Sequence, residues 1–131
     1  MIKRINRAIE KQSEFILERC LIDLFSQSKK IDESLYSTIE KIMFMKWHHQ
    51  HESIVNMIYL KNLKDNRFVI PIMEIAQNRE IYRPFDDELE STLRKCVHAL
   101  KMIDSNDSIQ ALEVLVKTGN ENVRFALGNY Q

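Results

Sequence analysis

The chain has 131 residues, of which 44% are hydrophobic and 29% charged, so its composition excludes an intrinsically disordered protein and fits a single domain, residues 1–131. Its 19 basic and 19 acidic side chains give no net charge, which disfavours a protein that works mainly by neutralising nucleic-acid phosphates. Strands joined by tight turns need glycine and proline at many corners, yet the chain has two of each. We therefore predict an all-α fold, a compact bundle of about six or seven helices.

The first predicted helix is long and runs from Ile2 to about Gln27. Apolar side chains recur along it at steps of three and four residues, and Gln12 interrupts the stripe. A helix of this length in a small domain would project beyond its own core, and its near-heptad spacing suits a partner helix. A homo-oligomer formed through this helix is therefore one hypothesis.

Residues 33–64 contain neither glycine nor proline, so they form either one long helix or two helices. Asp32 is a good N-cap, because its carboxylate can accept hydrogen bonds from the free amides of the first turn. A break at residues 49–53 would divide the segment, and we favour two helices.

Residues 65–85 have the weakest helical pattern. Asp65 and Asn66 suggest a turn, and residues 68–70 suggest a short extended piece. Pro71 suits the first position of a helix, where its missing amide is harmless, so we predict a short helix from Pro71 to about Arg79.

A helix with a clear amphipathic pattern is predicted to begin at Asp87, where the sequence Asp-Glu-Leu-Glu resembles a capping box. Acidic side chains are also favourable at the positive end of a helix dipole. The apolar stripe of this helix comprises Leu89, Leu93, Cys96, Val97, Leu100 and Ile103.

The chain closes with a predicted helical hairpin. Asp107 is expected to cap a helix over Ser108–Thr118, Gly119 to end it in a left-handed conformation, and Val123–Tyr130 to form the last helix. Residues 109–128 resemble one HEAT-type repeat, in which a leucine-rich helix, a polar turn and Val-Arg-x-Ala-Leu-Gly follow in order. The resemblance implies a surface for protein binding, although a single copy cannot build a solenoid.

The sequence lacks an apolar stretch of signal-peptide length at its N-terminus and any run that could span a membrane, so we expect a cytoplasmic protein. Cys20 and Cys96 lie within apolar helical stripes. In a reducing compartment they are most simply small core residues, although a disulfide between them stays open.

Charge is unevenly distributed. Residues 1–30 carry three more basic than acidic side chains, and residues 71–108 carry three more acidic than basic ones. These segments could pair within the fold, between copies, or with a partner, because opposite potentials attract. The candidate partner-binding residues are a basic face, Lys3, Arg4, Arg7 and Lys11, and an acidic face, Asp86, Asp87, Glu88 and Glu90.

Three histidines lie within residues 48–51. On one helix, His48, His51 and Glu52 would share a side, so they are weak candidates for metal ligands and would need partners from another helix. Without metal, the same histidines could give a response to pH near 6.

The function predicted from these observations is recognition without catalysis. The sequence has no nucleophile elbow, glycine-rich phosphate loop or recognisable Cys–His pair, and we expect no cofactor and no catalytic residue. We predict a helical protein-interaction module, such as an adaptor, chaperone, inhibitor or immunity-type regulator. The alternatives are a nucleic-acid-binding regulator that uses the basic N-terminal helix, and a metal-dependent protein.

Overall fold

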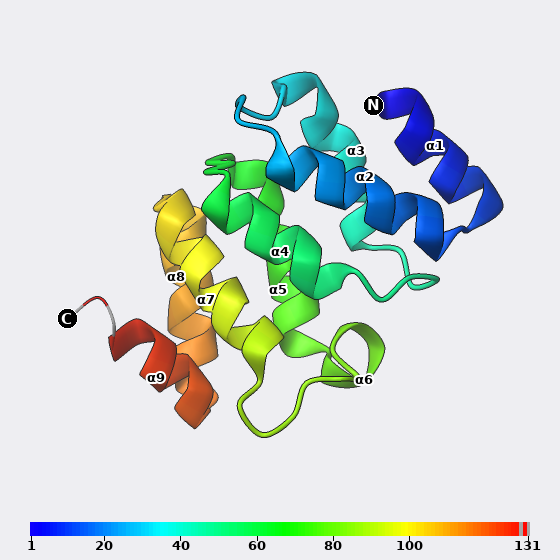
Figure 1. Cartoon of the computed structure of the whole chain (residues 1–131). Coiled ribbons are helices and arrows are strands. Elements are labelled where there is room, and N and C mark those ends of the chain that lie inside the picture. The colour runs from blue at the N-terminus through cyan, green and yellow to red at the C-terminus, as the bar shows by residue number, and fades with distance from the viewer. Residues whose placement is uncertain (129, 131) are drawn as a thin grey trace.

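The computed structural model describes residues 1–128 and 130, and within these residues every regular element is helical (Figure 1). Nine α-helices and two 3₁₀ helices are present there, and no strand. The predicted all-α class is confirmed. The helix number exceeds the predicted six or seven because the predicted N-terminal helix is divided in two and a further short helix, Arg79–Tyr82, follows the one predicted from Pro71. No described helix combines the length and the apolarity that crossing a bilayer requires.

The predicted long N-terminal helix is wrong, because the chain folds back at Gln12. Helix α1 (Ile2–Lys11) and helix α2 (Glu14–Ser26) form an antiparallel hairpin. Gln12 adopts the left-handed conformation (φ 47°, ψ 45°), and the Ser13 hydroxyl caps α2 by accepting a 3.2 Å hydrogen bond from an amide of its first turn.

This fold-back buries one face of α1 in the protein's own core. Ile5 and Ala8 have no exposed surface, so α1 does not project freely. The argument for a homo-oligomer based on a projecting helix is therefore removed.

The second region consists of two helices, as favoured. The 3₁₀ helix η1 (Glu33–Leu35) leads into α3 (Tyr36–Met43), residues 44–50 form an irregular linker, and α4 (His51–Leu60) follows. The predicted cap at Asp32 is confirmed, since its Oδ1 accepts a 2.8 Å hydrogen bond from the Ser34 amide.

The predicted extended piece at residues 68–70 is wrong. Instead, the 3₁₀ helix η2 (Asn66–Phe68) leads directly into α5 (Val69–Gln77), followed by the short α6 (Arg79–Tyr82). Asp65 starts this helical run by accepting a 2.9 Å hydrogen bond from the Arg67 amide. Pro71 thus occupies the third position of α5 and not the first. The amides of the first turn have no hydrogen-bond partner within the helix, so a proline is tolerated at the third position too.

The last three helices are α7 (Ser91–Ile103), α8 (Asn106–Lys117) and α9 (Glu121–Gly128). Two predicted starts are wrong. Helix α7 begins four residues after Asp87, and Ser105, rather than Asp107, caps α8 in a reciprocal capping box.

The predicted C-terminal hairpin is confirmed in its order of helix, turn and helix. Gly119 follows α8 with φ 74°, as expected for a residue that ends a helix. The last helix ends at Gly128, before the predicted Tyr130, and residue 129 lies outside the described residues. Within this hairpin Val123 and Ala126 are buried, whereas Phe125 is exposed.

Helix α7 lies at the centre of the molecule, where it packs against α4, α5, α8 and α9 (Figure 1). The predicted α7 stripe from Leu93 to Ile103 is buried, but Leu89 lies outside the helix and is exposed. Cys20 and Cys96 are both fully buried free thiols, which agrees with their predicted role as core residues. Burial raises the pKa of Cys96 to about 12.

Candidate protein-binding loop

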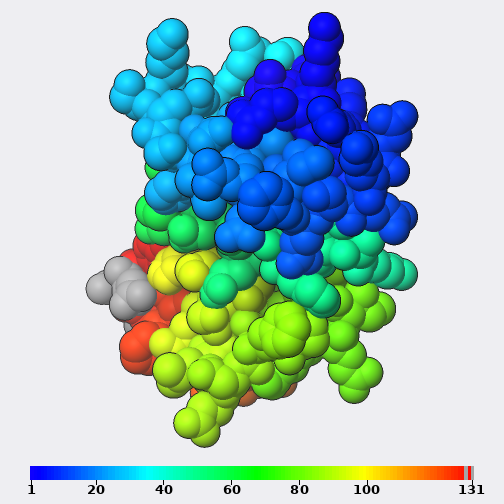
Figure 2. All heavy atoms as spheres, turned by 45° about the vertical axis from the view of Figure 1, so that its right-hand side comes forward, coloured from blue at the N-terminus to red at the C-terminus, as the bar shows by residue number. Residues whose placement is uncertain are grey.

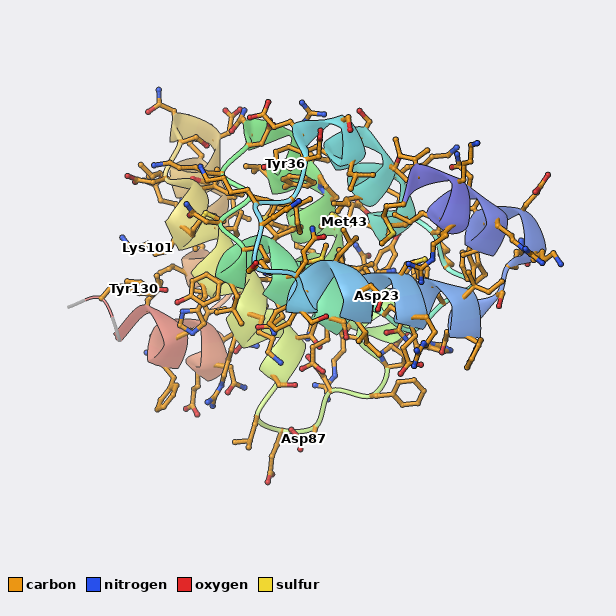
Figure 3. The ribbon with its side chains drawn as sticks, turned by 45° about the horizontal axis from the view of Figure 1, so that its top comes forward. Asp23, Tyr36, Met43, Asp87, Lys101 and Tyr130 are labelled. Atoms are coloured by element: carbon orange, nitrogen blue, oxygen red, sulfur yellow. The ribbon has the colours of Figure 1, made fainter. Side chains whose placement is uncertain are left out.

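The irregular segment between α6 and α7, residues 83–90, is referred to below as the 83–90 loop. It hangs from one end of the helical bundle (Figure 1). Figure 3 shows the side chain of Asp87 at the outer edge of this loop, pointing away from the helices. The loop contains the whole acidic face predicted from the sequence.

The Arg83 guanidinium anchors the loop from the inside. Its Nε and Nη2 donate hydrogen bonds of 3.0 and 2.9 Å to the carbonyl oxygens of Ile75 and Ala76, at the end of α5. Its Nη1 donates at 3.1 Å to Asp86 and at 3.2 Å to Glu90. All three charged side chains are at least 90% buried. Buried charges are tolerated only when they are paired and hydrogen-bonded, as here.

Asp86 accepts further hydrogen bonds from Thr92, at the start of α7. Asp86 Oδ1 accepts from the Thr92 amide at 3.2 Å and from its hydroxyl at 2.6 Å, so Asp86 caps α7 from outside the helix. Burial by itself would raise the pKa of Asp86, but the hydrogen bonds from Thr92 and the ion pair with Arg83 outweigh it and hold the pKa below its ordinary value. The Asp86 carboxylate is therefore charged at neutral pH.

The turn between α8 and α9 fixes the other side of the loop. Asn120 and Asn122 donate amide hydrogen bonds of 2.8 and 3.1 Å to Glu90 Oε2, and Asn122 donates a second, at 2.9 Å, to the Glu88 carbonyl oxygen. Burial by itself would raise the pKa of Glu90. The hydrogen bonds from these amides and the ion pair with Arg83 outweigh burial, so the pKa of Glu90 is below its ordinary value. The 83–90 loop is thus joined to α5, α7 and the α8–α9 turn.

This rigid support presents two large apolar side chains to solvent. Phe85 is 79% exposed and Leu89 is 56% exposed. The Phe85 ring contacts the His49 ring edge-on, with centroids 5.0 Å apart. Sequence reasoning missed Phe85 and assigned Leu89 to a buried stripe. The available signal was an aromatic residue placed directly between a proline and two acidic residues.

The predicted acidic face is therefore only half accessible. Asp86 and Glu90 are internal partners of Arg83, whereas Asp87 and Glu88 are exposed. Asp87 Oδ1 accepts a 2.9 Å hydrogen bond from the Leu89 amide, which shapes the turn. The surface that the structure presents combines two apolar anchors with two carboxylates.

The predicted basic face lies on α1, at the opposite end of the molecule (Figure 2). Lys3, Arg4, Arg7 and Lys11 are all exposed, and Arg4 forms a 2.8 Å ion pair with Asp23 of α2. Among the described residues, no ion pair joins the basic segment 1–30 to the acidic segment 71–108. The ion pair of segment 1–30 is internal to it, whereas segment 71–108 has internal pairs and one pair, Lys95 with Glu52, to α4.

The predicted helical arrangement of the histidines is wrong, because His48 lies in the α3–α4 linker. The His48 and His51 rings are buried and stacked, with centroids 4.3 Å apart. Their Nε2 atoms donate to the carbonyl oxygens of Ile42 and Met45 at 2.8 and 2.9 Å, and His48 Nδ1 accepts from the Gln50 amide at 3.0 Å. Carbonyl oxygens can only accept, so both rings carry a proton on Nε2. His48 is neutral because its Nδ1 accepts a hydrogen bond, and His51 is neutral at pH 7 because burial lowers its pKa to about 4.

Glu52 does not join these histidines. Its Oε2 accepts from the Ser91 hydroxyl at 2.6 Å and from Lys95 Nζ at 3.0 Å, which ties α4 to α7. Within the part of the chain that the structure describes, no group of three or more His, Cys, Asp or Glu side chains is arranged to hold a metal ion. Three of the four nitrogens of the two buried rings, both Nε2 atoms and His48 Nδ1, have backbone hydrogen-bond partners.

Comparison of the chain with protein-family models, with curated proteins and with solved structures finds no match.

Proposed function

We propose that this chain is a non-catalytic protein-interaction module that recognises a partner protein through the 83–90 loop. The observation that carries the proposal is the contrast within the loop: a buried ion cluster fixes its backbone, while Phe85 and Leu89 are left in solvent. Exposed aromatic and aliphatic side chains on a preorganised support are the groups that contribute most to binding at protein interfaces.

The chemistry of the loop indicates the chemistry of the partner. Phe85 and Leu89 would fill an apolar cleft, and the exposed Asp87 and Glu88 would lie against lysine or arginine side chains at its rim. An adaptor, an inhibitor or an immunity-type regulator that binds a basic surface fits this description.

We expect the double variant Phe85→Ala, Leu89→Ala to lose its partner while remaining folded. Truncation should weaken binding by roughly 30-fold for each anchor and by several hundredfold for both, since each interfacial anchor is worth about 2 kcal/mol. The measurement is a quantitative affinity capture followed by mass spectrometry and a binding isotherm for the proteins retained. Thermal unfolding of each variant checks that both removed side chains were on the surface.

The double variant Phe15→Ala, Leu60→Ala is the matched control, because Phe15 is 74% exposed on α2 and Leu60 is 55% exposed on α4, both outside the loop. Partners lost by the loop variant and kept by the control would support the proposal. If the captured set and its affinities were the same for all three proteins, the loop would not be the binding surface.

A nucleic-acid-binding regulator is the second proposal, favoured by the exposed stripe of Lys3, Arg7 and Lys11 along one side of α1. The triple change of these residues to glutamate discriminates the two functions. It should abolish binding to DNA or RNA and its steep salt dependence, but should leave capture through the 83–90 loop intact.

A further inference from the structure

A second surface, distinct from the 83–90 loop, is the groove between α5 and α8, referred to below as the α5/α8 groove. It has a volume of about 590 Å³. Val69 and Met73 of α5 and Ala111 of α8 line it, and its two rims carry Ile70, which is 70% exposed, and Val114, which is 45% exposed. Apolar side chains of two neighbouring helices thus face solvent along a shared groove.

The spacing of the lining residues suits a helical ligand. Asp107, Gln110, Ala111 and Val114 lie at i, i+3, i+4 and i+7 on α8, so they form one continuous wall. Seven residues of helix span about 10 Å, or roughly two turns of a helix laid along the wall. Grooves between helices bind amphipathic helices through aliphatic side chains at the same periodicity.

One part of the groove is acidic. Glu40 and Asp107 line it and, among the described residues, neither forms an ion pair. Asp107 accepts a 2.6 Å hydrogen bond from the side-chain amide of Asn66, a neutral donor. The lining cation, Arg67, is already held by Asp65 at 3.0 Å. A ligand that brings its own cation would complement this site.

We propose that the α5/α8 groove binds a basic amphipathic helix of a partner protein. Its aliphatic stripe contacts Ile70, Met73 and Val114, and a lysine or arginine lies against Glu40 and Asp107. This interaction does not depend on the 83–90 loop, so either surface can fail its test without the other.

The test uses two synthetic helical peptides with the same leucine stripe, one carrying lysines beside the stripe and the other glutamates. Binding to the full chain is measured by fluorescence anisotropy at low and at raised salt. We expect the lysine peptide to bind and the glutamate peptide to bind at least about tenfold more weakly. Binding of the lysine peptide should weaken as salt rises.

Substitutions locate the site. The double variant Ile70→Ala, Val114→Ala should bind the lysine peptide about tenfold more weakly. The double variant Glu40→Gln, Asp107→Asn should bind it several-fold more weakly, with a flatter dependence on salt. The matched control is Ile109→Ala with Val116→Ala, the same residue types at 45% and 42% exposure on another part of the surface of α8, which should bind as the unmodified protein does.

Three results would overturn the proposal. Neither peptide binds, or the control pair weakens binding as much as the groove pair, or light scattering shows a dimer that Ile70→Ala with Val114→Ala dissociates. In the last case the groove is an interface between copies of this chain.

Discussion

Replacing Arg83 with methionine is expected to lower the free energy of unfolding by about 3 to 5 kcal/mol, because the change leaves the buried Asp86 without its cation and Glu90 with only the half-exposed Arg79. Asp86 and Glu90 would keep their hydrogen bonds from Thr92, Asn120 and Asn122, but not the charge that makes their burial tolerable. The measurement is urea denaturation at neutral pH, followed by circular dichroism.

Arg79→Met is the matched control. Arg79 pairs with the same Glu90, at 3.4 Å, but its side chain is 49% exposed, so its removal should cost no more than about 1 kcal/mol. Equal costs for the two variants would contradict the assignment of Arg83 as the internal anchor.

The Arg83 variant has a second signature that remains measurable if it is too unstable at neutral pH. Without Arg83, the pKa of Asp86 and that of Glu90 are higher than in the unmodified chain, so protonation on acidification relieves the defect. The difference in stability from the unmodified chain should therefore shrink as the pH falls. The triple variant Arg83→Met, Asp86→Asn, Glu90→Gln should likewise recover part of the loss.

The second large effect is an acid transition caused by the buried histidine pair. Burial and, to a lesser extent, the neighbouring His48 lower the pKa of His51 to about 4. The pKa of His48 is also lowered, first by burial. His49 opposes the charging of both rings, whereas Glu14 and the carbonyl oxygens of Ile42 and Met45 favour it. Their combined influence leaves both rings neutral at pH 7.

The direction in which stability changes with pH follows from the number of protons that the folded and unfolded states bind. A histidine in the unfolded chain has a pKa of about 6.5, so between that value and about 4 the unfolded state binds more protons than the folded state. Stability is complete above pH 6.5 and is lost as the pH falls through this window. For His51 the loss amounts to about 3 kcal/mol, or on the order of 10 °C in the melting temperature.

His51→Gln tests this prediction by thermal unfolding between pH 7 and pH 4.5. The variant loses packing against Tyr82, whose ring centroid lies 5.0 Å away, but it should show a flatter dependence on pH than the unmodified chain. His49→Gln is the control, since His49 is exposed, and should keep most of the slope, because its charge is only a minor cause of the lowered pKa of the two buried rings. Parallel slopes for His51→Gln and the unmodified chain would contradict the prediction. The carboxylates of the loop, with pKa values below their ordinary range, act at lower pH.

Sequence patterns predicted what local chemistry determines. The helical class follows from the scarcity of glycine and proline, the cap at Asp32 from a single carboxylate, and the end of α8 from Gly119. The stripe from Leu93 to Ile103 was readable because it faces one core along its whole length. These features depend on residues at most a few positions apart.

Features that depend on distant contacts were misread. The left-handed Gln12 looks like any polar residue within a helical pattern, and only the packing of α1 on α2 fixes its conformation. The acidic run at Asp86–Glu90 satisfies the rule for a capping box, but Glu90 has φ 43° and cannot continue a helix. Its true partners, Arg83 and Asn120, lie seven and thirty positions away.

The sequence located the candidate site but did not reveal which of its side chains are exposed. The acidic residues of the 83–90 loop were identified as a charged surface, yet two of the four are internal, and the exposed apolar residues beside them were overlooked. Nothing local distinguishes Asp86 from Asp87. The distinction is made by an arginine whose position is set by the end of α5.

The reactivity of the two buried thiols reports local unfolding of the protein. Cys20 belongs to the N-terminal hairpin and Cys96 to the central helix, and neither has surface that a thiol reagent could reach in the closed state. Modification of either one must therefore wait for the helices around it to separate, and its rate reports the free energy of that separation. A hairpin that opens before the centre would reveal itself as a faster reaction at Cys20 than at Cys96, in the unmodified protein and without an added label.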